Sequence, residues 1–358
     1  MRAYNFFAGP AVLPVEVLNA AAAAVHEFNG MGVSILEVSH RDKAFEAVLN
    51  EAIADLKSLV GIPDNYKVLF LTGGASTQFA MVPMNFLPKD GYADYVDTGT
   101  WSSKAIKEAK LFGKVNVVAS SKEATYNHIP KGVKFAPGAA YAHITSNNTI
   151  YGSEWHYWPE SGDVPLICDM SSDIMARKID AKKFAMIYAG AQKNMGPAGV
   201  TLTIIREDLF VRTPASIPTM LKYTTHVEEN SLYNTPPVYA ILVVREVLRW
   251  LKGLGGVEEI EKRNRRKAGM LYEVLDKHPI YKPHIKDPNS RSLMNVTWRC
   301  TDEPTEEALL AEAKKMKMLG LKGHRSVGGL RASIYNACPE ESVKVLCDLL
   351  EKFAASHK

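Results

Sequence analysis

Short apolar runs alternate with longer helical stretches between residues 67 and 206. The runs have the length and composition of buried strands, and they span residues 67–71, 93–97, 114–118, 164–169, 184–190 and 200–206. In such an alternation the strands form a mostly parallel or mixed sheet with helices on both faces. The pattern therefore predicts an α/β fold, with ligands bound where strands deliver their carboxyl ends.

The pattern changes after two long helical stretches at residues 237–252 and 256–277. Beyond them single strands alternate with helices, at residues 293–298, 304–319, 331–336 and 339–356. This change predicts a separate, smaller α+β layer in the last part of the chain.

Composition and charge exclude several classes of protein. The 358 residues suffice for two domains, and the net charge of +4 (43 basic minus 39 acidic residues) is spread along the chain. Nucleic-acid binding is therefore not implied. No apolar run approaches the roughly 18 residues of a membrane span, so no membrane association is expected. The alanine-rich run before His26 reads as an amphipathic helix rather than a targeting signal.

The cysteines and histidines indicate neither disulfides nor a metal site. The four cysteines lack paired spacing and the density of a secreted scaffold, so a reducing cytoplasm fits best. No pair of His or Cys residues stands at zinc spacing on one element, and the chain has no G-x-S-x-G motif of a serine hydrolase.

Lys193 stands in an unusual setting. It is the only charged residue between Phe184 and Ile205, and it lies between two apolar strands among small residues. Burying an ammonium group costs free energy, and a covalent imine would remove that cost. A lysine at a loop tip whose head reaches water fits this segment equally well.

Asp169 ends the apolar run VPLIC, 24 positions before Lys193 (193 minus 169). Both residues stand at the end of a predicted buried strand, and neighbouring strands would bring them together. A carboxylate in that place can keep a pyridinium nitrogen protonated, as pyridoxal phosphate chemistry requires. An aspartate that caps the following SSD turn is the alternative.

Two further loops follow strand ends. In LTGGASTQF the free N–H groups of a helix start, with the hydroxyls of Ser76 and Thr77, suit a phosphate, although the spacing matches no nucleotide-binding loop and a plain glycine turn remains an alternative. Trp101, in YVDTGTWSSKA, is either a core plug or a stacking platform, and the residue alone favours the plug.

Two short loops combine histidine with arginine. EVSHRD contains His40 and Arg41, and KGHRSVGGLRASIYN contains His324, Arg325 and Arg331. Guanidinium groups bind carboxylates and phosphates through paired hydrogen bonds. Surface solvation explains either loop alone, but the two together indicate a small substrate with two anionic ends.

Distinctive segments occur over nearly the whole chain, and they read NFFAGPAVLP, EVSHRDKAF, TGGASTQFAMVPMN, ADYVDTGTWSSKAIKEAK, YAGAQKNMGPAGVT, YNTPPVYA and LKGHRSVGGLRASIYNA. Together they resemble the phosphoserine aminotransferases, which are fold type I pyridoxal-phosphate enzymes of the class V subgroup. The resemblance implies a large domain with a seven-stranded, mostly parallel mixed sheet and a smaller α+β domain. We expect an N-terminal segment (1–15) that packs with the small domain, a large cofactor-binding domain (16–262) and a small C-terminal domain (263–358).

The resemblance also implies which residues bind the cofactor, one pyridoxal 5'-phosphate per subunit. Lys193 would hold it as a Schiff base, Asp169 would pair with its pyridine nitrogen, and Trp101 would stack on its ring; these three are the expected catalytic residues. Thr149 would hydrogen-bond its phenolic oxygen. Its phosphate would be held by Ala75, Ser76 and Gln192, and by Asn234 and Thr235 of a neighbouring subunit.

Substrate binding and assembly follow from the same resemblance. The active form would be a homodimer with sites at its interface. Arg331 would bind the substrate α-carboxylate, and the distal anion would be received by His40 and Arg41, with His324 and Arg325 from the partner. Ser76 departs from family members that have an arginine there, so that cationic contact to the substrate phosphate is absent.

The implied reaction belongs to serine biosynthesis. The amino group of L-glutamate passes reversibly to 3-phosphohydroxypyruvate, giving 2-oxoglutarate and O-phospho-L-serine, with Lys193 as both tether and acid–base group. The same pocket would accept 4-phosphohydroxythreonine, a substrate of pyridoxine biosynthesis.

The alternatives are another fold type I enzyme, such as an aminotransferase for small 2-oxo acids or a cysteine desulfurase, and a catalytically silent binding protein. The two His-Arg loops argue against glyoxylate-type substrates, which have no distal anion. A silent homologue would be expected to lack Lys193 or Asp169, and both are present.

Overall fold

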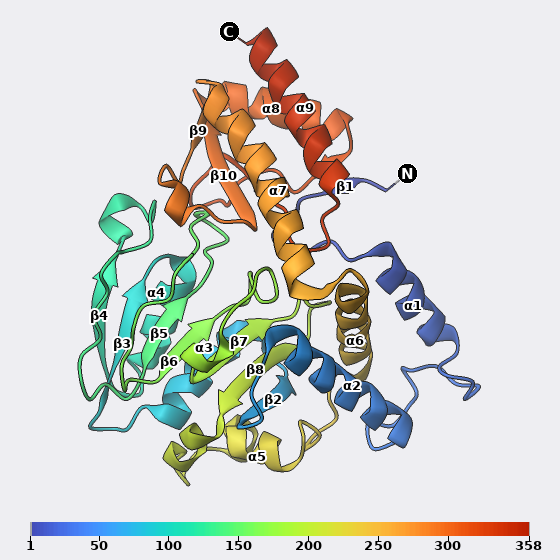
Figure 1. Ribbon diagram of the computed structural model, residues 1–358, viewed down its shortest axis with the longest axis vertical. Helices are drawn as coiled ribbons and strands as arrows, with labels where there is room; N and C mark the ends of the chain where they lie inside the picture. Colours follow the sequence, from blue (N-terminus) through green and yellow to red (C-terminus); the bar gives the residue numbers. More distant parts are fainter. Residues whose placement is uncertain (1, 358) are drawn as a thin grey trace.

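A seven-stranded sheet forms the centre of the larger part of the molecule in this computed structural model, which describes residues 2–357 (Figure 1). In the order β2-β8-β7-β6-β5-β3-β4, β8 pairs antiparallel with both neighbours and the other pairs are parallel. This confirms the predicted mixed, mostly parallel sheet. The strands are β2 (Tyr66–Leu71), β3 (Tyr92–Asp97), β4 (Lys114–Ser120), β5 (Ala142–Thr145), β6 (Leu166–Asp169), β7 (Met186–Gly190) and β8 (Thr201–Arg206).

The apolar pattern predicts six of these strands and misses β5. That strand has four residues, and His143 interrupts its apolar run. It is nevertheless buried along its whole length, because it pairs with β3 on one side and β6 on the other. The position of β5 matters, since it brings Thr145 level with Asp169 of β6.

Helices cover both faces of the sheet, as the alternating pattern predicts. On one face α2 (Lys43–Val60) and α6 (Val238–Gly253) share an apolar cluster with the strands, and α1 (Val15–His26) packs against α6. On the other face lie α3 (Gly74–Phe86), α4 (Thr100–Ala109) and the short α5 (Tyr223–Glu228). Helix α2 shows why the helices pack on the sheet, since its apolar residues lie on one side of the helix. These residues recur at helical spacing and are all buried, namely Phe45, Val48, Leu49, Ala52 and Leu56.

The last third of the chain forms the smaller α+β layer that the pattern predicts, around its own apolar cluster. Its three-stranded antiparallel sheet has the order β12-β10-β9. Its elements are α7 (Gly256–Lys277), β9 (Tyr281–Pro283), β10 (Asn295–Cys300), α8 (Glu303–Lys315), β11 (Met318–Leu319), β12 (Leu330–Ser333) and α9 (Glu340–Ser356).

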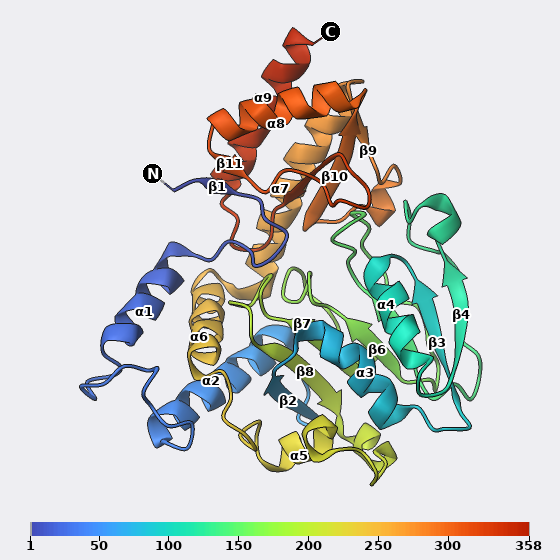
Figure 2. The same cartoon turned by 180° about the vertical axis from the view of Figure 1, so that it is seen from behind.

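The predicted helix 304–319 is too long by four residues at its carboxyl end. Helix α8 ends at Lys315, and Lys317 has a left-handed backbone with φ of 58°. The next two residues form β11, because they pair in parallel with β1 (Tyr4–Asn5) from the start of the chain (Figure 2). A partner more than 300 residues away therefore decides the structure here (318 minus 4 is 314).

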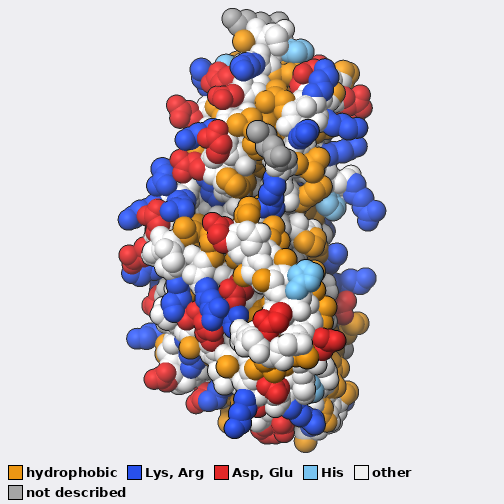
Figure 3. Space-filling model, turned by 90° about the vertical axis from the view of Figure 1, so that its right-hand side faces the viewer, with side chains coloured by type: hydrophobic (Ala, Val, Ile, Leu, Met, Phe, Trp, Pro, Cys, Tyr) orange, Lys and Arg blue, Asp and Glu red, His pale blue; other side chains and the backbone are white. Residues whose placement is uncertain are grey.

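The N-terminal segment contacts the small layer, since Phe6 and Val12 belong to its apolar cluster. Helix α7 runs without a break through the predicted domain boundary at residues 262 and 263, so the boundary itself stays a prediction. On the face shown in Figure 3, acidic and basic side chains are interspersed. Among residues 2–357, none of the helices has the length and apolar character needed to cross a membrane.

Candidate active site

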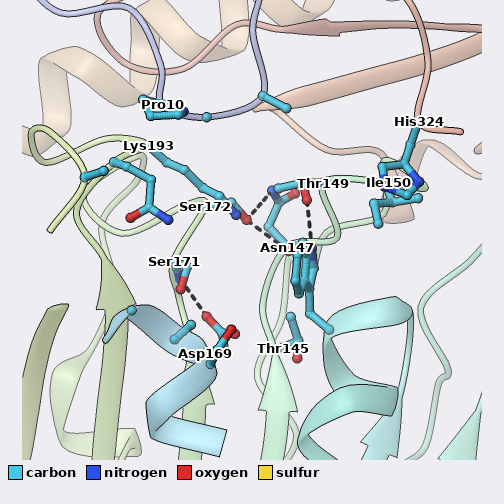
Figure 4. Close-up of a pocket in the computed structure, with 18 of the residues that line it drawn as sticks. Pro10, Thr145, Asn147, Thr149, Ile150, Asp169, Ser171, Ser172, Lys193 and His324 are labelled. Carbon is cyan, nitrogen blue, oxygen red and sulfur yellow. Dashed lines mark hydrogen bonds between the residues drawn. The ribbon is translucent and has the colours of Figure 1, made fainter. Parts of the chain in front are cut away.

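A pocket of about 470 Å³ lies where the parallel strands end (Figure 4). Strands β2, β3, β5, β6 and β7 each deliver a residue to its wall at or just after their carboxyl ends, namely Gly73, Trp101, Thr145, Asp169 and Lys193. The smaller layer adds His324 and Arg331, and the N-terminal segment adds Ala8, Gly9 and Pro10. The pocket therefore lies where the sheet topology predicts a ligand.

Lys193 and Asp169 border this pocket from adjacent strand ends. Asp169 ends β6 opposite Tyr188 of β7, and Lys193 follows β7 by three residues. Burial lowers the pKa of Lys193 to about 8; the negative charge of Asp169 opposes this shift, and the positive charge of Arg331 adds to it. Because an amine must lose its proton before it can act as nucleophile or base, this environment favours the reactive form.

Asp169 is buried, and its burial raises the pKa of its carboxyl group, while the hydrogen bond with Ser171 and the charge of Lys193 oppose the rise. Its Oδ1 accepts a hydrogen bond from the Ser171 backbone N–H at 2.9 Å, so it caps the turn as the alternative interpretation predicts. Yet it forms no salt bridge within residues 2–357 and still borders the pocket. A protonated ring nitrogen would supply the missing positive partner.

The turn between β2 and α3 has the features of a phosphate cradle. Gly73 and Gly74 have φ values of 89° and 67°, and α3 begins directly at Gly74. Ala75 and Ser76 therefore lie in the first turn of the helix, where backbone N–H groups have no helical acceptor and no acidic residue repels an anion. The Thr77 hydroxyl donates to the Gly73 carbonyl at 3.0 Å, so it holds the turn together rather than facing a ligand.

We expect Gly73→Ala to damage this turn more than Gly74→Ala does. Both positions have left-handed backbones, which cost a non-glycine residue about 1–2 kcal/mol. A Cβ at Gly73 would also come within 2.0 Å of the Thr77 Oγ1, whereas none of the described atoms lies within 4 Å at Gly74. Urea unfolding midpoints of the two variants measure the difference. Equal midpoints would contradict the predicted steric conflict.

Trp101 presents its ring to the pocket from the first turn of α4. Its Nε1 donates to the Thr149 Oγ1 at 2.9 Å, and the Lys193 Nζ lies 5.7 Å from the ring centroid. Ser102 and Ser103 fix this turn, since each hydroxyl donates to the Asp97 carboxylate at 2.8 Å. The half-buried indole also packs on the apolar cluster beneath α3 and α4. Trp101 therefore both packs against the core, as a plug would, and presents its ring to the pocket, as a stacking platform would.

Arg331, on β12, has a hydrogen-bond donor that is unused in the described part of the chain. Its Nη1 donates to the Thr149 carbonyl at 2.8 Å, while its buried Nε has no acceptor. Burial lowers the pKa of this guanidinium, and no carboxylate pairs with it within residues 2–357. An unpaired guanidinium facing a pocket is suited to an incoming carboxylate.

Sequence reasoning missed several polar residues of the wall, among them Asn147, Ser171 and Ser172. The Asn147 Nδ2 donates to the Ser172 Oγ and to the Asn295 Oδ1, both at 2.8 Å, and thereby joins the two layers beneath the pocket. The sequence contains a signal for the two serines, since they stand two and three positions after Asp169, in the turn that follows its strand. Asn147 follows β5, the strand that the apolar pattern misses.

The basic residues are arranged differently from the expectation. His324 lines the pocket of its own chain, whereas the resemblance implies that a partner contributes it; a bridge between Lys322 and Leu330 closes its loop beside the site. In contrast, His40 and Arg41, just before α2, are absent from the described wall of this pocket. So are Arg325, Asn234 and Thr235, which are exposed. Of the expected residues, the wall contains Ala75, Ser76, Trp101, Thr149, Asp169, Gln192, Lys193, His324 and Arg331.

Comparison with known proteins agrees with this geometry. The family model described as "Aminotransferase class-V" matches residues 3–346, so the chain belongs to the class-V aminotransferases. A phosphoserine aminotransferase of Lysinibacillus sphaericus is 55% identical, with 100% of this chain and 99% of the relative covered. One of Desulfatibacillum aliphaticivorans is 54% identical, with 98% of each covered. The chain belongs to the phosphoserine aminotransferase family.

Solved structures give the same result. Phosphoserine aminotransferase from Bacillus circulans subsp. alkalophilus superposes with a TM-score of 0.97 at 51% identity, covering 100% of this chain and 99% of that one. The PLP-bound enzyme from Trichomonas vaginalis superposes with a TM-score of 0.93 at 38% identity, covering 98% and 100%.

Proposed function

We propose that this chain is a pyridoxal-phosphate-dependent aminotransferase that transfers the amino group of L-glutamate to 3-phosphohydroxypyruvate. The products are 2-oxoglutarate and O-phospho-L-serine, and the reaction is reversible. One observation supports this function most directly: Lys193 and Asp169 stand on adjacent strand ends beside an unpaired Arg331 guanidinium. Full-length relatives that are phosphoserine aminotransferases support the choice of substrate.

The wall of the pocket fits the cofactor at each of its ends. Pyridoxal phosphate, when bound, withdraws electrons from the substrate carbon that loses its proton. Lys193 would hold it covalently, Asp169 would hold a proton on the ring nitrogen, and the Trp101 indole would cover one face of the ring. The Thr149 hydroxyl accepts from Trp101 and keeps its own hydrogen for the phenolic oxygen. The phosphate would be held by Ala75, Ser76 and Gln192.

The Lys193 amine also moves the proton of the substrate. With a pKa lowered to about 8 by burial, a sizeable fraction of this amine is neutral in mildly alkaline solution. A neutral Nζ can take the proton from the substrate Cα and return it elsewhere on the same face. The Trp101 indole, whose ring centroid lies 5.7 Å from the Lys193 Nζ, would limit the access of water to this transfer.

Glutamate and phosphoserine each have an α-carboxylate and a distal anion. Arg331 would bind the α-carboxylate through its free donors, and His324 would face the distal group. His40 and Arg41 do not line the pocket of their own chain, so we propose that a second subunit supplies them. The oxo acid of 4-phosphohydroxythreonine has the same two charges and is proposed as a second substrate.

A homodimer would also bring Asn234 and Thr235 to the cofactor phosphate. Asn234 borders a cavity of about 150 Å³ that it shares with Gly73, beside the phosphate turn. Exposed apolar side chains lie next to the residues that the dimer requires, with Leu36 61% exposed near His40 and Tyr233 44% exposed next to Asn234. We propose a cytoplasmic enzyme, which agrees with four free, buried cysteines.

The test is a substrate panel with the enzyme loaded with pyridoxal phosphate. With glutamate as donor, release of 2-oxoglutarate is followed for 3-phosphohydroxypyruvate, pyruvate and glyoxylate. We expect the phosphorylated acceptor to give the highest kcat/KM. A higher kcat/KM with glyoxylate or pyruvate would overturn the proposal, and sedimentation of the enzyme as a monomer would overturn the dimer.

A further inference from the structure

Lys104 places a positive charge at the edge of the pocket. It lies one turn after Trp101 on α4, and its Nζ lies 4.7 Å from the Trp101 ring centroid. The side chain is exposed, and no carboxylate lies within 4 Å of it in the part of the chain that the structure describes. An ammonium held against an indole, with no acidic partner in the described chain, is available to bind an anionic ligand.

Other basic groups line the same opening, and neither His324 nor Arg331 forms a salt bridge within residues 2–357. His324 and Arg331 line the pocket, and the positive charges of Arg331, Arg325 and Lys104 add to burial in lowering the pKa of His324. Asp97, at the end of β3 before α4, already accepts hydrogen bonds from the hydroxyls of Ser102, Ser103 and Tyr126. Basic groups that face one another without acidic partners favour the binding of an anion, and a neutral His324 ring can still donate a hydrogen bond to it.

The backbone under Lys104 is rigid enough for a binding site. The Ser102 hydroxyl accepts from the N–H groups of Thr98 and Gly99 at 2.9 Å, so the start of α4 is fixed to the end of β3. Lys104 follows on this turn, and its own side chain has four rotatable bonds with which to reach a ligand. Across the pocket, Ser76 of the phosphate turn contributes no charge.

We propose that Lys104 determines specificity for the distal anion of the substrate, whose phosphate or carboxylate its ammonium binds together with His324. This inference rests on the proposed function. Lys104 thus distinguishes acceptors with a distal anion from those without one, and it contributes to binding rather than to proton transfer.

Lys104→Met tests the proposal, because methionine keeps the length of the side chain and removes its charge. Lys107→Met is the matched control, since Lys107 is exposed on the same helix and pairs with no carboxylate within residues 2–357. We expect Lys104→Met to lower kcat/KM for 3-phosphohydroxypyruvate about two- to fivefold through KM, the range of an exposed charge contact. For pyruvate, which has no distal anion, kcat/KM should stay unchanged.

A purely structural role of Lys104 in supporting Trp101 gives another result. It would lower kcat/KM for both acceptors equally and would weaken cofactor binding, and either finding would overturn the proposal. So would a Lys104→Met enzyme that behaves like Lys107→Met.

A binding measurement separates this proposal from the proposed function. Inorganic phosphate is titrated into the wild type and both variants by calorimetry, and the His324 ring is titrated by NMR with a His324→Asn spectrum for assignment. We expect weaker phosphate binding and a raised His324 pKa in Lys104→Met alone. If the wild type fails to turn over 3-phosphohydroxypyruvate, the proposed function fails, but the binding comparison still tests the role of Lys104. Phosphate binding that is the same in Lys104→Met and wild type would overturn the proposed role of Lys104.

Discussion

Lys193→Ala is expected to lower the rate of amino transfer from glutamate by at least about 10³-fold, because proton transfer by a positioned side chain alone contributes about 10²- to 10⁴-fold and the covalent attachment is lost as well. Rapid mixing of the loaded variant with glutamate measures the first half of the reaction without the acceptor. The cofactor should still bind, because Asp169, Trp101 and the phosphate turn remain.

Lys183→Ala is the control, since Lys183 is exposed and pairs only with the exposed Glu160. Added methylamine should restore part of the rate of Lys193→Ala, because a small free amine can occupy the space of the missing one. A Lys193→Ala enzyme with a near wild-type rate would show that another group moves the proton.

Arg177→Met is expected to destabilise the folded protein by about 3–5 kcal/mol, the cost of leaving buried charges without their partner. Arg177 is buried between two acids: its Nε lies 3.1 Å from a carboxylate oxygen of Glu154, and its Nη2 lies 3.3 Å from one of Asp173. Asp173 in turn accepts from Ser146, whose hydroxyl also contacts the Asp169 carbonyl at 2.9 Å. The three charges therefore support the strand end on which Asp169 stands.

The loss of stability should depend on pH in a defined direction. Burial raises the pKa of Asp173 to about 7 and also raises the pKa of Glu154, and the charge of Arg177 opposes both shifts. Without Arg177 both pKa values rise further. A raised carboxyl pKa reduces stability as the pH increases from the unfolded value through the folded one. The deficit of Arg177→Met should therefore be larger at pH 8 than at pH 5.

Urea unfolding at the two pH values measures this deficit. Lys178→Met, at the adjacent position, removes only an exposed pair with Glu258 and should leave the midpoint almost unchanged. An equal loss of stability of Arg177→Met at both pH values would mean that Glu154 and Asp173 do not cause the destabilisation.

The proximity of Lys193 and Asp169 could be predicted from the sequence because both residues stand at or just after the ends of apolar strands. Position along the chain is enough to place Lys193 and Asp169 at strand ends, and the parallel topology then brings them to one edge. From the sequence alone, Lys193 could equally be a lysine at a loop tip, and Asp169 could equally be the cap of the following turn. For Asp169 the structure shows why, since the same carboxylate caps a turn and borders the pocket.

Other features depend on contacts that no local pattern contains. Strand β5 is buried by its neighbours rather than by its own composition, and β11 exists because β1 pairs with it. His324 reaches the pocket of its own chain through the fold-back between Lys322 and Leu330, which spacing in the sequence does not reveal. Pairing with residues far along the chain decides the structure of β5 and β11, whereas the loop of His324 is closed by a bridge between residues eight positions apart.

The route of the first dozen residues has a consequence for how the protein is made. Strand β1 pairs with β11, Ala8 to Pro10 form part of the pocket wall, and the Ala11 N–H donates to the Gln192 carbonyl at 2.8 Å. These residues are synthesised more than 300 residues before their partner strand. A nascent chain can therefore pair the strands of its central sheet before the partner strand of β1 has been synthesised. The enzyme should gain its activity in a single late step, when translation has passed β11.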